Sequence, residues 1–153
     1  MSAARWTRAN AWIAVGTPMI LKETGGIVPE EADIVRRYKR MMQGLLAYQQ
    51  ENGLWNTVMD RADFYPETSG SAGIAAGLLK AWRMGLLGDE VLEPTRRALQ
   101  GVLANIGEDG TVLSVSGGTP VMPTVEAYNE IPCFPTLYGQ GLTLILLAEA
   151  LGG

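Results

Sequence analysis

The stretch TSGSAGIAAGLLKAWRMGL, residues 68–86, decides the fold class of this chain. Its apolar positions recur at helical spacing, and Thr68 or Ser69 can cap its first turn. Small side chains weaken an isolated helix but let neighbouring helices approach closely. Here they occupy Gly70, Ala72, Gly73, Ala75, Ala76 and Gly77. The stretch therefore predicts an interior helix with other helices packed around it.

Helical spacing continues on both sides of this stretch, so the chain is expected to be all-α. The expected helices span residues 8–22, 29–51, 68–86, 89–106 and 139–151. Pro18 should kink or shorten the first of them, because proline lacks the backbone N–H that a helix interior uses. The last is apolar almost all round, so we expect it to be buried.

A different pattern lies between the last two helices. Residues 111–116 alternate as a short strand would, which predicts a strand-like segment near 111–122. Residues 121–138 contain three prolines and are expected to form a long ordered loop, a kind of segment that is often functional in compact domains. The helices pair into hairpins of about forty residues, a period typical of stacked helical repeats or α/α toroids. Residues 1–153 are expected to form a single domain.

Composition excludes several classes of function. Hydrophobic residues make up 47% of the chain and charged residues 18%, with a net charge of −4, which is typical of globular proteins rather than disordered or membrane proteins. The basic run at residues 36–40 falls inside a predicted helix and is expected to be a solvated face, so a nucleic-acid partner is not expected. No stretch reaches the length and apolarity of a membrane span or a secretion signal, and the expected location is the cytoplasm.

Cysteine and histidine usage restricts the chemistry further. Cys133 is the only cysteine and the chain has no histidine. A disulfide framework, a zinc site of the usual ligands and a Ser/His or Cys/His catalytic pair are therefore excluded within this chain, and we expect no metal and no cofactor. Any acid–base chemistry falls to carboxylates, lysine or tyrosine.

Near the N-terminus, Trp6, Arg8, Asn10 and Trp12 stand at every second position. Two indoles, a guanidinium and an amide supply flat apolar faces and planar hydrogen-bond donors, the chemistry that binds a sugar ring and its carboxylate. The alternative is that both indoles anchor the core and that Arg8 pairs with an acid at the surface. Both interpretations remain open from the residues alone.

A set of motifs in fixed order resembles a known family. After Trp6-Thr7-Arg8-Ala9-Asn10-Ala11-Trp12 come Tyr48-Gln49 with Gly53-Leu54-Trp55, Glu67-Thr68-Ser69, Asp109-Gly110-Thr111-Val112 with Ser116-Gly117-Gly118-Thr119, and Tyr138-Gly139-Gln140-Gly141. This order is similar to the C-terminal half of the unsaturated glucuronyl and rhamnogalacturonyl hydrolases, glycoside hydrolase families 88 and 105. The resemblance covers nearly the whole chain, and the ordered set is far more specific than any one motif.

The resemblance implies a toroid of six α-helical hairpins, of which this chain would form roughly half. It also implies action on unsaturated uronic-acid oligosaccharides, the fragments that polysaccharide lyases leave. The implied reaction is hydration of the C4=C5 double bond, in which an aspartate protonates the alkene and activates water, and the resulting hemiketal collapses. That route differs from the two-carboxylate displacement of ordinary glycosidases. The implied catalytic aspartate lies upstream of the Trp6 motif, so no catalytic residue is assigned in this chain.

Residue roles follow from the same resemblance. Trp6 and Trp12 would wall the sugar pocket, Arg8 would bind the uronate carboxylate or a hydroxyl, and Asn10 would fix the local backbone or hydrogen-bond the sugar. Glu67 is a further substrate-binding candidate, with plain helix capping as its alternative.

Other positions carry weaker expectations. Trp55 and Phe64 could extend an aromatic wall, although loop aromatics more often cover a core edge. Ala9 and Ala11 replace glycines of the family motif Trp-Ala-Arg-Gly-Asn-Gly-Trp, so either methyl group could narrow the sugar site.

Three functional hypotheses result. The first is an unsaturated uronyl hydrolase domain that is active when the missing acid is supplied, and the second is a catalytically inactive sugar-binding module. The third is a helical interaction module that shares only the fold. Helices cut from a toroid would expose apolar flanks, so we expect a homo-oligomer or a partner that is a separately encoded N-terminal half.

Overall fold

The computed structural model describes residues 4–25, 27 and 29–152. In these residues the elements are α1 (Thr7–Thr24), α2 (Glu31–Leu46), α3 (Thr68–Arg83), η1 (Asp89–Val91), α4 (Leu92–Leu103), η2 (Glu126–Glu130) and α5 (Leu137–Ala150). The predicted all-α class is confirmed. Strand pairing within the described residues is limited to isolated bridges, such as those joining Trp6 to Val58 and Ser116 to Cys133.

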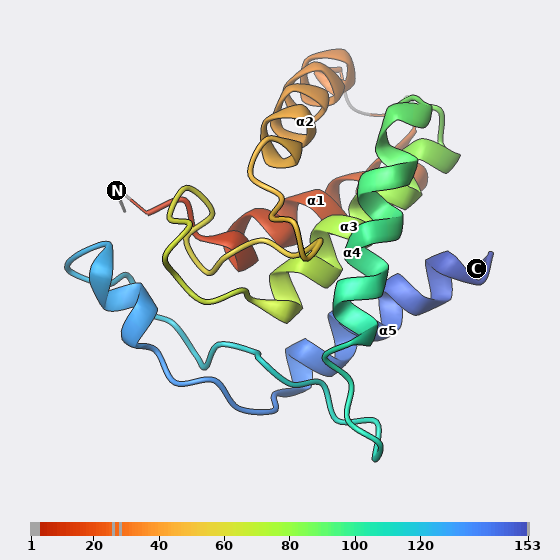
Figure 1. The fold of residues 1–153 in the computed structure, drawn as a ribbon. Helices are drawn as coiled ribbons and strands as arrows, with labels where there is room; N and C mark the ends of the chain where they lie inside the picture. The colour runs from red at the N-terminus through yellow and green to blue at the C-terminus, as the bar shows by residue number, and fades with distance from the viewer. Residues whose placement is uncertain (1–3, 26, 28, 153) are drawn as a thin grey trace.

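Helices α1, α3 and α5 form one layer with α3 in the middle (Figure 1). A Cβ atom added at Gly70 would lie 2.7 Å from the side chain of Thr7, and one at Gly77 would lie 2.3 Å from the carbonyl oxygen of Ala14. Residue numbers thus rise together along the two helices, so α1 and α3 run in the same direction. Helix α5 is parallel to them. Gly73 of α3 faces Leu142 of α5, and Arg83, later in α3, binds Glu149, later in α5.

The small residues of α3 produce this close packing, as the sequence predicts. Every residue of α3 from Thr68 to Leu78 is buried. The main core combines α3 with apolar side chains of the surrounding helices and of the segment that precedes α3. Its largest fully buried side chain is Trp55, whose indole nitrogen donates to the Leu45 carbonyl at 2.7 Å. Trp55 is therefore a core residue and does not extend a sugar-binding wall.

Pro18 does not shorten α1, which continues to Thr24. Proline lacks the N–H that would bond to the carbonyl four residues earlier, here that of Ala14. The Tyr38 hydroxyl of α2 donates to this carbonyl at 2.8 Å, and the tyrosine is only 3% exposed. A side chain from the next helix thus satisfies the acceptor that Pro18 leaves free, which lets the proline remain inside the helix.

The strand-like segment predicted near 111–122 is not a strand. Val112 and Ser116 each make one isolated bridge, and between them Ser114 has a φ of 55°. A positive φ interrupts the extended backbone that a strand requires. The segment is instead an irregular turn whose Ser114 carbonyl accepts from the backbone N–H of Thr68 at 3.0 Å.

The last helix also departs from its prediction. Leu142 and Leu146 are buried, but Leu144 is 64% exposed and Leu137 is 92% exposed. Helix α5 packs on α3 along one side, and the apolar side chains on its other side remain exposed.

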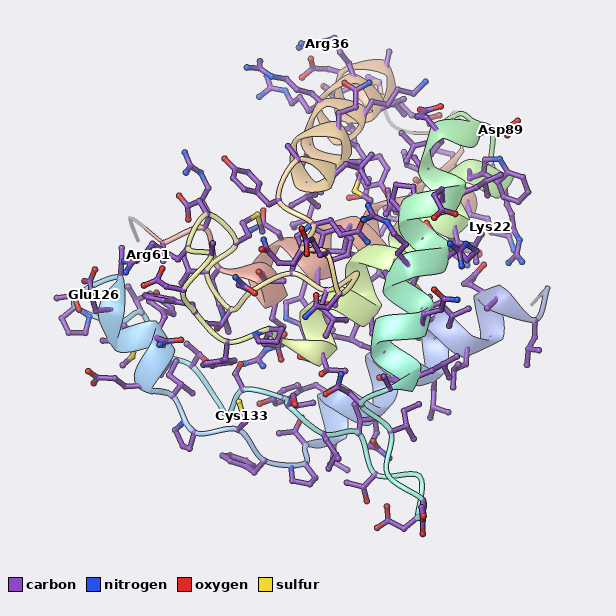
Figure 2. All side chains as sticks on the ribbon, viewed as in Figure 1. Lys22, Arg36, Arg61, Asp89, Glu126 and Cys133 are labelled. Atoms are coloured by element: carbon purple, nitrogen blue, oxygen red, sulfur yellow. The ribbon has the colours of Figure 1, made fainter. Side chains whose placement is uncertain are left out.

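A second, smaller core lies under the long loop. Phe64, Val58, Tyr128 and Ile131 form this cluster, against which Trp6 packs. An ion pair of 2.8 Å between Arg61 and Glu126, visible in Figure 2, fastens the same two segments at the surface. The predicted ordered loop is thus held on the start of α1, and Phe64 is a core residue rather than part of an exposed aromatic wall.

Candidate functional site

The N-terminal ends of α1, α3 and α5 meet at one end of the layer, and Arg8 lies among them. The backbone N–H of Thr7 donates to the Thr57 carbonyl at 3.0 Å, which fixes where α1 begins. Arg8 is 3% exposed and points toward the loop at Ser116–Thr119. The site is therefore built from segments more than a hundred residues apart in the sequence.

Both terminal nitrogens of the Arg8 guanidinium donate to this loop. Its Nη1 donates to the carbonyl and hydroxyl oxygens of Ser116, both at 2.7 Å. Its Nη2 donates to the Gly117 carbonyl at 2.8 Å and to the Thr119 hydroxyl at 3.2 Å. The four N–H bonds on these two nitrogens thus have acceptors within the chain, and Arg8 is a buried loop anchor.

Two aromatic rings enclose the same guanidinium. Its central carbon lies 4.8 Å from the ring centre of Trp6 and 4.3 Å from that of Tyr138, which are cation–π distances. The Tyr138 hydroxyl donates to the Ser116 carbonyl at 2.7 Å, so this hydroxyl and the Arg8 guanidinium donate to the same carbonyl oxygen. Tyr138 is not among the substrate-binding candidates that the sequence predicts. Its place in the ordered motif set was the signal that connected it to this site.

Glu67 supplies the negative charge behind Arg8. It is fully buried, and its Oε1 lies 3.5 Å from Arg8 Nη1 while accepting from the Ser69 hydroxyl at 2.7 Å and the Ser116 N–H at 3.1 Å. Its Oε2 accepts from the N–H of Gly70 at 2.6 Å. The capping interpretation of Glu67 is confirmed. Since both oxygens are occupied and buried, the carboxylate as it stands offers no surface to a sugar.

The other candidates of the first motif separate on α1. Asn10 Nδ2 donates to the Trp6 carbonyl at 2.8 Å, which fixes the local backbone, the first of its two expected roles. Trp12 is 47% exposed. It does not join Trp6 in lining the pocket described next.

A pocket of about 270 Å³ lies beside Trp6. It carries no charged side chain, and its lining consists of Ala4, Trp6, Ala9, Thr119, Pro120, Val121 and Tyr128. Its volume is just below the range of about 300 to 1,000 Å³ that small-molecule sites occupy. The pocket therefore has room for one uncharged ring rather than for a carboxylate.

The two alanines that replace family glycines face different ways. Ala11 is fully buried and its methyl group faces Gly73 of α3, so it fills the helix interface and does not narrow a sugar site. Ala9 is exposed and lines the pocket beside Trp6. The expected narrowing therefore applies to Ala9 alone.

The remaining titratable groups near the site do not form a metal centre. Burial raises the pKa of the Cys133 thiol, with the Glu67 carboxylate acting in the same direction, so the thiol is protonated at neutral pH. Among the residues that the structure describes, no three His, Cys, Asp or Glu side chains gather as metal ligands. Within the same residues no helix is both long and apolar enough to cross a membrane.

Comparison with known proteins identifies the family. The family model of Glycosyl Hydrolase Family 88 matches residues 1–152. The unsaturated rhamnogalacturonyl hydrolase YesR of Bacillus subtilis is 34% identical over 152 residues, which are 99% of this chain and 42% of that protein. The chain belongs to glycosyl hydrolase family 88, as the motif order predicts.

Solved structures agree with this assignment. A possible member of the GH105 family from Salmonella enterica superposes with a TM-score of 0.91 at 30% identity, over 97% of this chain and 40% of that one. The unsaturated glucuronyl hydrolase of Bacillus sp. GL1 shares the fold, with a TM-score of 0.72 at 20% identity over 98% of this chain and 40% of that one. The five helices are thus part of the α/α toroid of these enzymes. The chain spans less than half the length of the relatives that it matches.

Proposed function

We propose that this chain forms part of a hydrolase that acts on unsaturated uronic-acid oligosaccharides. The observation that carries the proposal is the 34% identity to an unsaturated rhamnogalacturonyl hydrolase across 99% of the chain. The reaction would be hydration of the C4=C5 double bond of the terminal uronic acid. The aspartate that donates the proton would come from the part of the toroid that lies outside this chain.

The contribution of this chain would be to hold the substrate. The uncharged pocket beside Trp6 suits a neutral sugar ring, and the indole supplies an apolar face for it. The Arg8 guanidinium, neutralised by Glu67 and bonded to Ser116 and Gly117, would keep the wall of that pocket at Thr119 in place. We therefore assign Arg8 a positioning role, and leave binding of the uronate carboxylate to groups with free donors.

The test is a reconstituted toroid. This chain would be co-expressed with the remainder of YesR, and the complex given an unsaturated uronyl-rhamnose disaccharide. Turnover removes the conjugated double bond, so absorbance in the ultraviolet should fall. Trp6→Leu should weaken binding, whereas Trp82→Leu, at the far end of α3, should leave it unchanged. An assembled complex that binds without turnover would favour the sugar-binding alternative, and one that neither binds nor turns over would contradict the proposal.

A further inference from the structure

A second pocket lies on the segment that joins α2 to α3. This segment, residues 47–67, winds through several turns (Figure 1). The pocket has a volume of about 460 Å³, within the range of about 300 to 1,000 Å³ that small-molecule sites occupy. Its lining residues all belong to the range 50–66, and within the described part of the chain no residue lines both this pocket and the one beside Trp6. We name it the loop pocket.

The second core supports both pockets. Phe64 lines the loop pocket and belongs to the same apolar cluster as Val58 and Tyr128. Tyr128 and Trp6 line the other pocket. Phe64 is 7% exposed and Val58 is fully buried, so the segment that carries the loop pocket is anchored in a packed core. The loop pocket is therefore a second, separately lined site on an ordered support.

Asn56 presents a fixed acceptor to the loop pocket. It is 3% exposed, its backbone carbonyl accepts from the Thr7 hydroxyl, and its Nδ2 donates to the Arg61 carbonyl at 2.8 Å. These bonds use the amide nitrogen and orient the amide oxygen. No donor among the described residues binds Asn56 Oδ1, so this acceptor is left for a molecule in the pocket.

Asn52 and Gln50 supply a donor and a second acceptor. Asn52 Oδ1 accepts from the Leu54 N–H at 3.0 Å, which leaves its Nδ2 as a donor. Gln50 Nε2 donates to the Tyr48 carbonyl at 2.8 Å, which leaves its Oε1 as an acceptor. Neither of these two remaining atoms has another partner in the part of the chain that the structure describes. The loop pocket thus presents one amide donor and two amide acceptors, each on a side chain whose other polar atom is already bonded.

This set of groups suits hydroxyls rather than ions. A hydroxyl can donate to an amide oxygen and accept from an amide nitrogen, so neighbouring hydroxyls of a sugar ring match a mixed set of amides. Among the described residues that line the pocket, Glu51 alone carries a charge, and its sign disfavours a uronate or a phosphate. Phe64, Ala62 and Pro66 add apolar surface for the C–H face of a ring.

We propose that the loop pocket binds a neutral sugar residue, with Asn56, Asn52 and Gln50 as its hydrogen-bonding groups. This inference goes beyond the proposed function, because the loop pocket would hold carbohydrate without converting it. A second contact with carbohydrate on the same molecule raises the effective concentration of sugar at the first. The loop pocket would therefore retain polysaccharide fragments close to the pocket beside Trp6.

The experiment follows binding by NMR spectroscopy of the isotope-labelled chain. Methyl galactoside and methyl galacturonoside, whose rings differ only in a carboxylate, are titrated separately, and methyl glucoside and methyl rhamnoside cover other arrangements of hydroxyls. We expect at least one neutral sugar to shift the side-chain amide signals of Asn56 and Asn52 saturably, with a Kd in the millimolar range. Methyl galacturonoside should shift these signals at least tenfold less tightly than the neutral sugar that binds best. The indole signal of Trp6 reports separately on the other pocket.

Asn52→Asp tests the free donor with a small change. The carboxylate keeps the oxygen that accepts from the Leu54 N–H and loses only the nitrogen that is left for a ligand, so affinity should fall about fivefold while circular dichroism shows the fold intact. Gln43→Glu makes the matched exchange at an exposed position of α2 outside the pocket and should bind as the unaltered chain does. Ala9→Leu fills the pocket beside Trp6 and should also leave affinity at the loop pocket unchanged.

The opposite results are equally clear. If none of the neutral sugars shifts the Asn56 and Asn52 signals saturably, or if the shifts are confined to the Trp6 indole, the proposal is overturned. Equal affinity of Asn52→Asp and the unaltered chain would also overturn it. Failure of the reconstituted toroid to turn over its substrate would contradict the proposed function and leave this inference intact.

Discussion

Arg8 illustrates what a single residue can do in this site. Its guanidinium lies between the rings of Trp6 and Tyr138 and holds the Ser116 and Gly117 carbonyls, with Glu67 as counter-ion. The sequence predicted the residue type and its importance from the motif. It could not predict the loop partners, because Ser116 lies 108 residues further along the chain and only tertiary structure brings it to Arg8.

Replacing Arg8 should destabilise the protein strongly. Arg8→Ala leaves the fully buried Glu67 carboxylate without its counter-ion and frees two carbonyls, which should lower the free energy of unfolding by about 3 to 5 kcal/mol. Urea denaturation followed by circular dichroism measures this. Arg5→Ala breaks an exposed ion pair with Asp60 and a guanidinium contact with the Tyr48 ring at 5.8 Å, and should cost only about 1 kcal/mol. Similar losses for the two variants would contradict the anchoring role.

Tyr38 and Pro18 form a second residue-level relation that local sequence rules do not show. Proline rules predict a kink or an end at Pro18, and they fail because the Tyr38 hydroxyl supplies the missing donor to Ala14. Tyr38→Phe leaves the Ala14 carbonyl without that donor in a buried position. We expect a loss of about 1 to 3 kcal/mol at pH 8, measured by urea denaturation.

The same variant has a pH signature. Burial raises the pKa of Tyr38 well above its usual value, so the folded state keeps the proton after the unfolded chain has lost it. Its contribution to stability is complete below the unfolded pKa of about 10 and falls as the pH rises above it. The stability gap between the native protein and Tyr38→Phe should therefore narrow by about 1 kcal/mol by pH 11. A gap that stays constant would show that the hydroxyl is not buried as described.

At the scale of elements, small residues decide how the helices pack. The prediction of an interior helix over 68–86 is confirmed over Thr68–Arg83, because glycine and alanine patterns report directly on close packing. The prediction for residues 111–116 is wrong, since alternation alone does not reveal the positive φ at Ser114. The prediction that the last helix is buried is wrong for the same kind of reason. Its apolar character is local, whereas its neighbours are set by the rest of the fold.

Two glycine substitutions separate packing from helix propensity. A Cβ atom at Gly77 would lie 2.3 Å from the Ala14 carbonyl oxygen, so Gly77→Ala forces α1 and α3 apart and should cost about 1 to 3 kcal/mol. Gly44 lies in α2 with nothing within 4 Å of such an atom. Gly44→Ala should stabilise by about 0.5 to 1 kcal/mol. Thermal denaturation of both variants checks the signs. Two shifts of equal sign would contradict the packing described for α3.

For the whole molecule, α1 and α5 each expose large apolar side chains, among them Ile20 and Leu144. The order of the motifs predicts the family and the half-toroid, because each motif is a short stretch of sequence that can be recognised without knowledge of the tertiary structure. The structure, in contrast, is needed to show that these two side chains lie exposed at opposite sides of the layer. A protein with such exposed apolar side chains should be more stable when a partner covers them, since a partner that binds only the folded state adds its binding free energy to folding.

This coupling gives a quantitative expectation for the most buried element. At a concentration of the YesR remainder about 100 times its Kd, the free energy of unfolding should rise by about 2.7 kcal/mol. The amides of α3, which lie in the fully buried centre of the layer, exchange only on global opening, so their exchange should slow about a hundredfold. Leu144→Glu at the same partner concentration should show much less slowing, because a charge on the exposed side of α5 opposes burial under the partner. Protection of α3 that is independent of the partner would mean that closing the ring does not stabilise the chain.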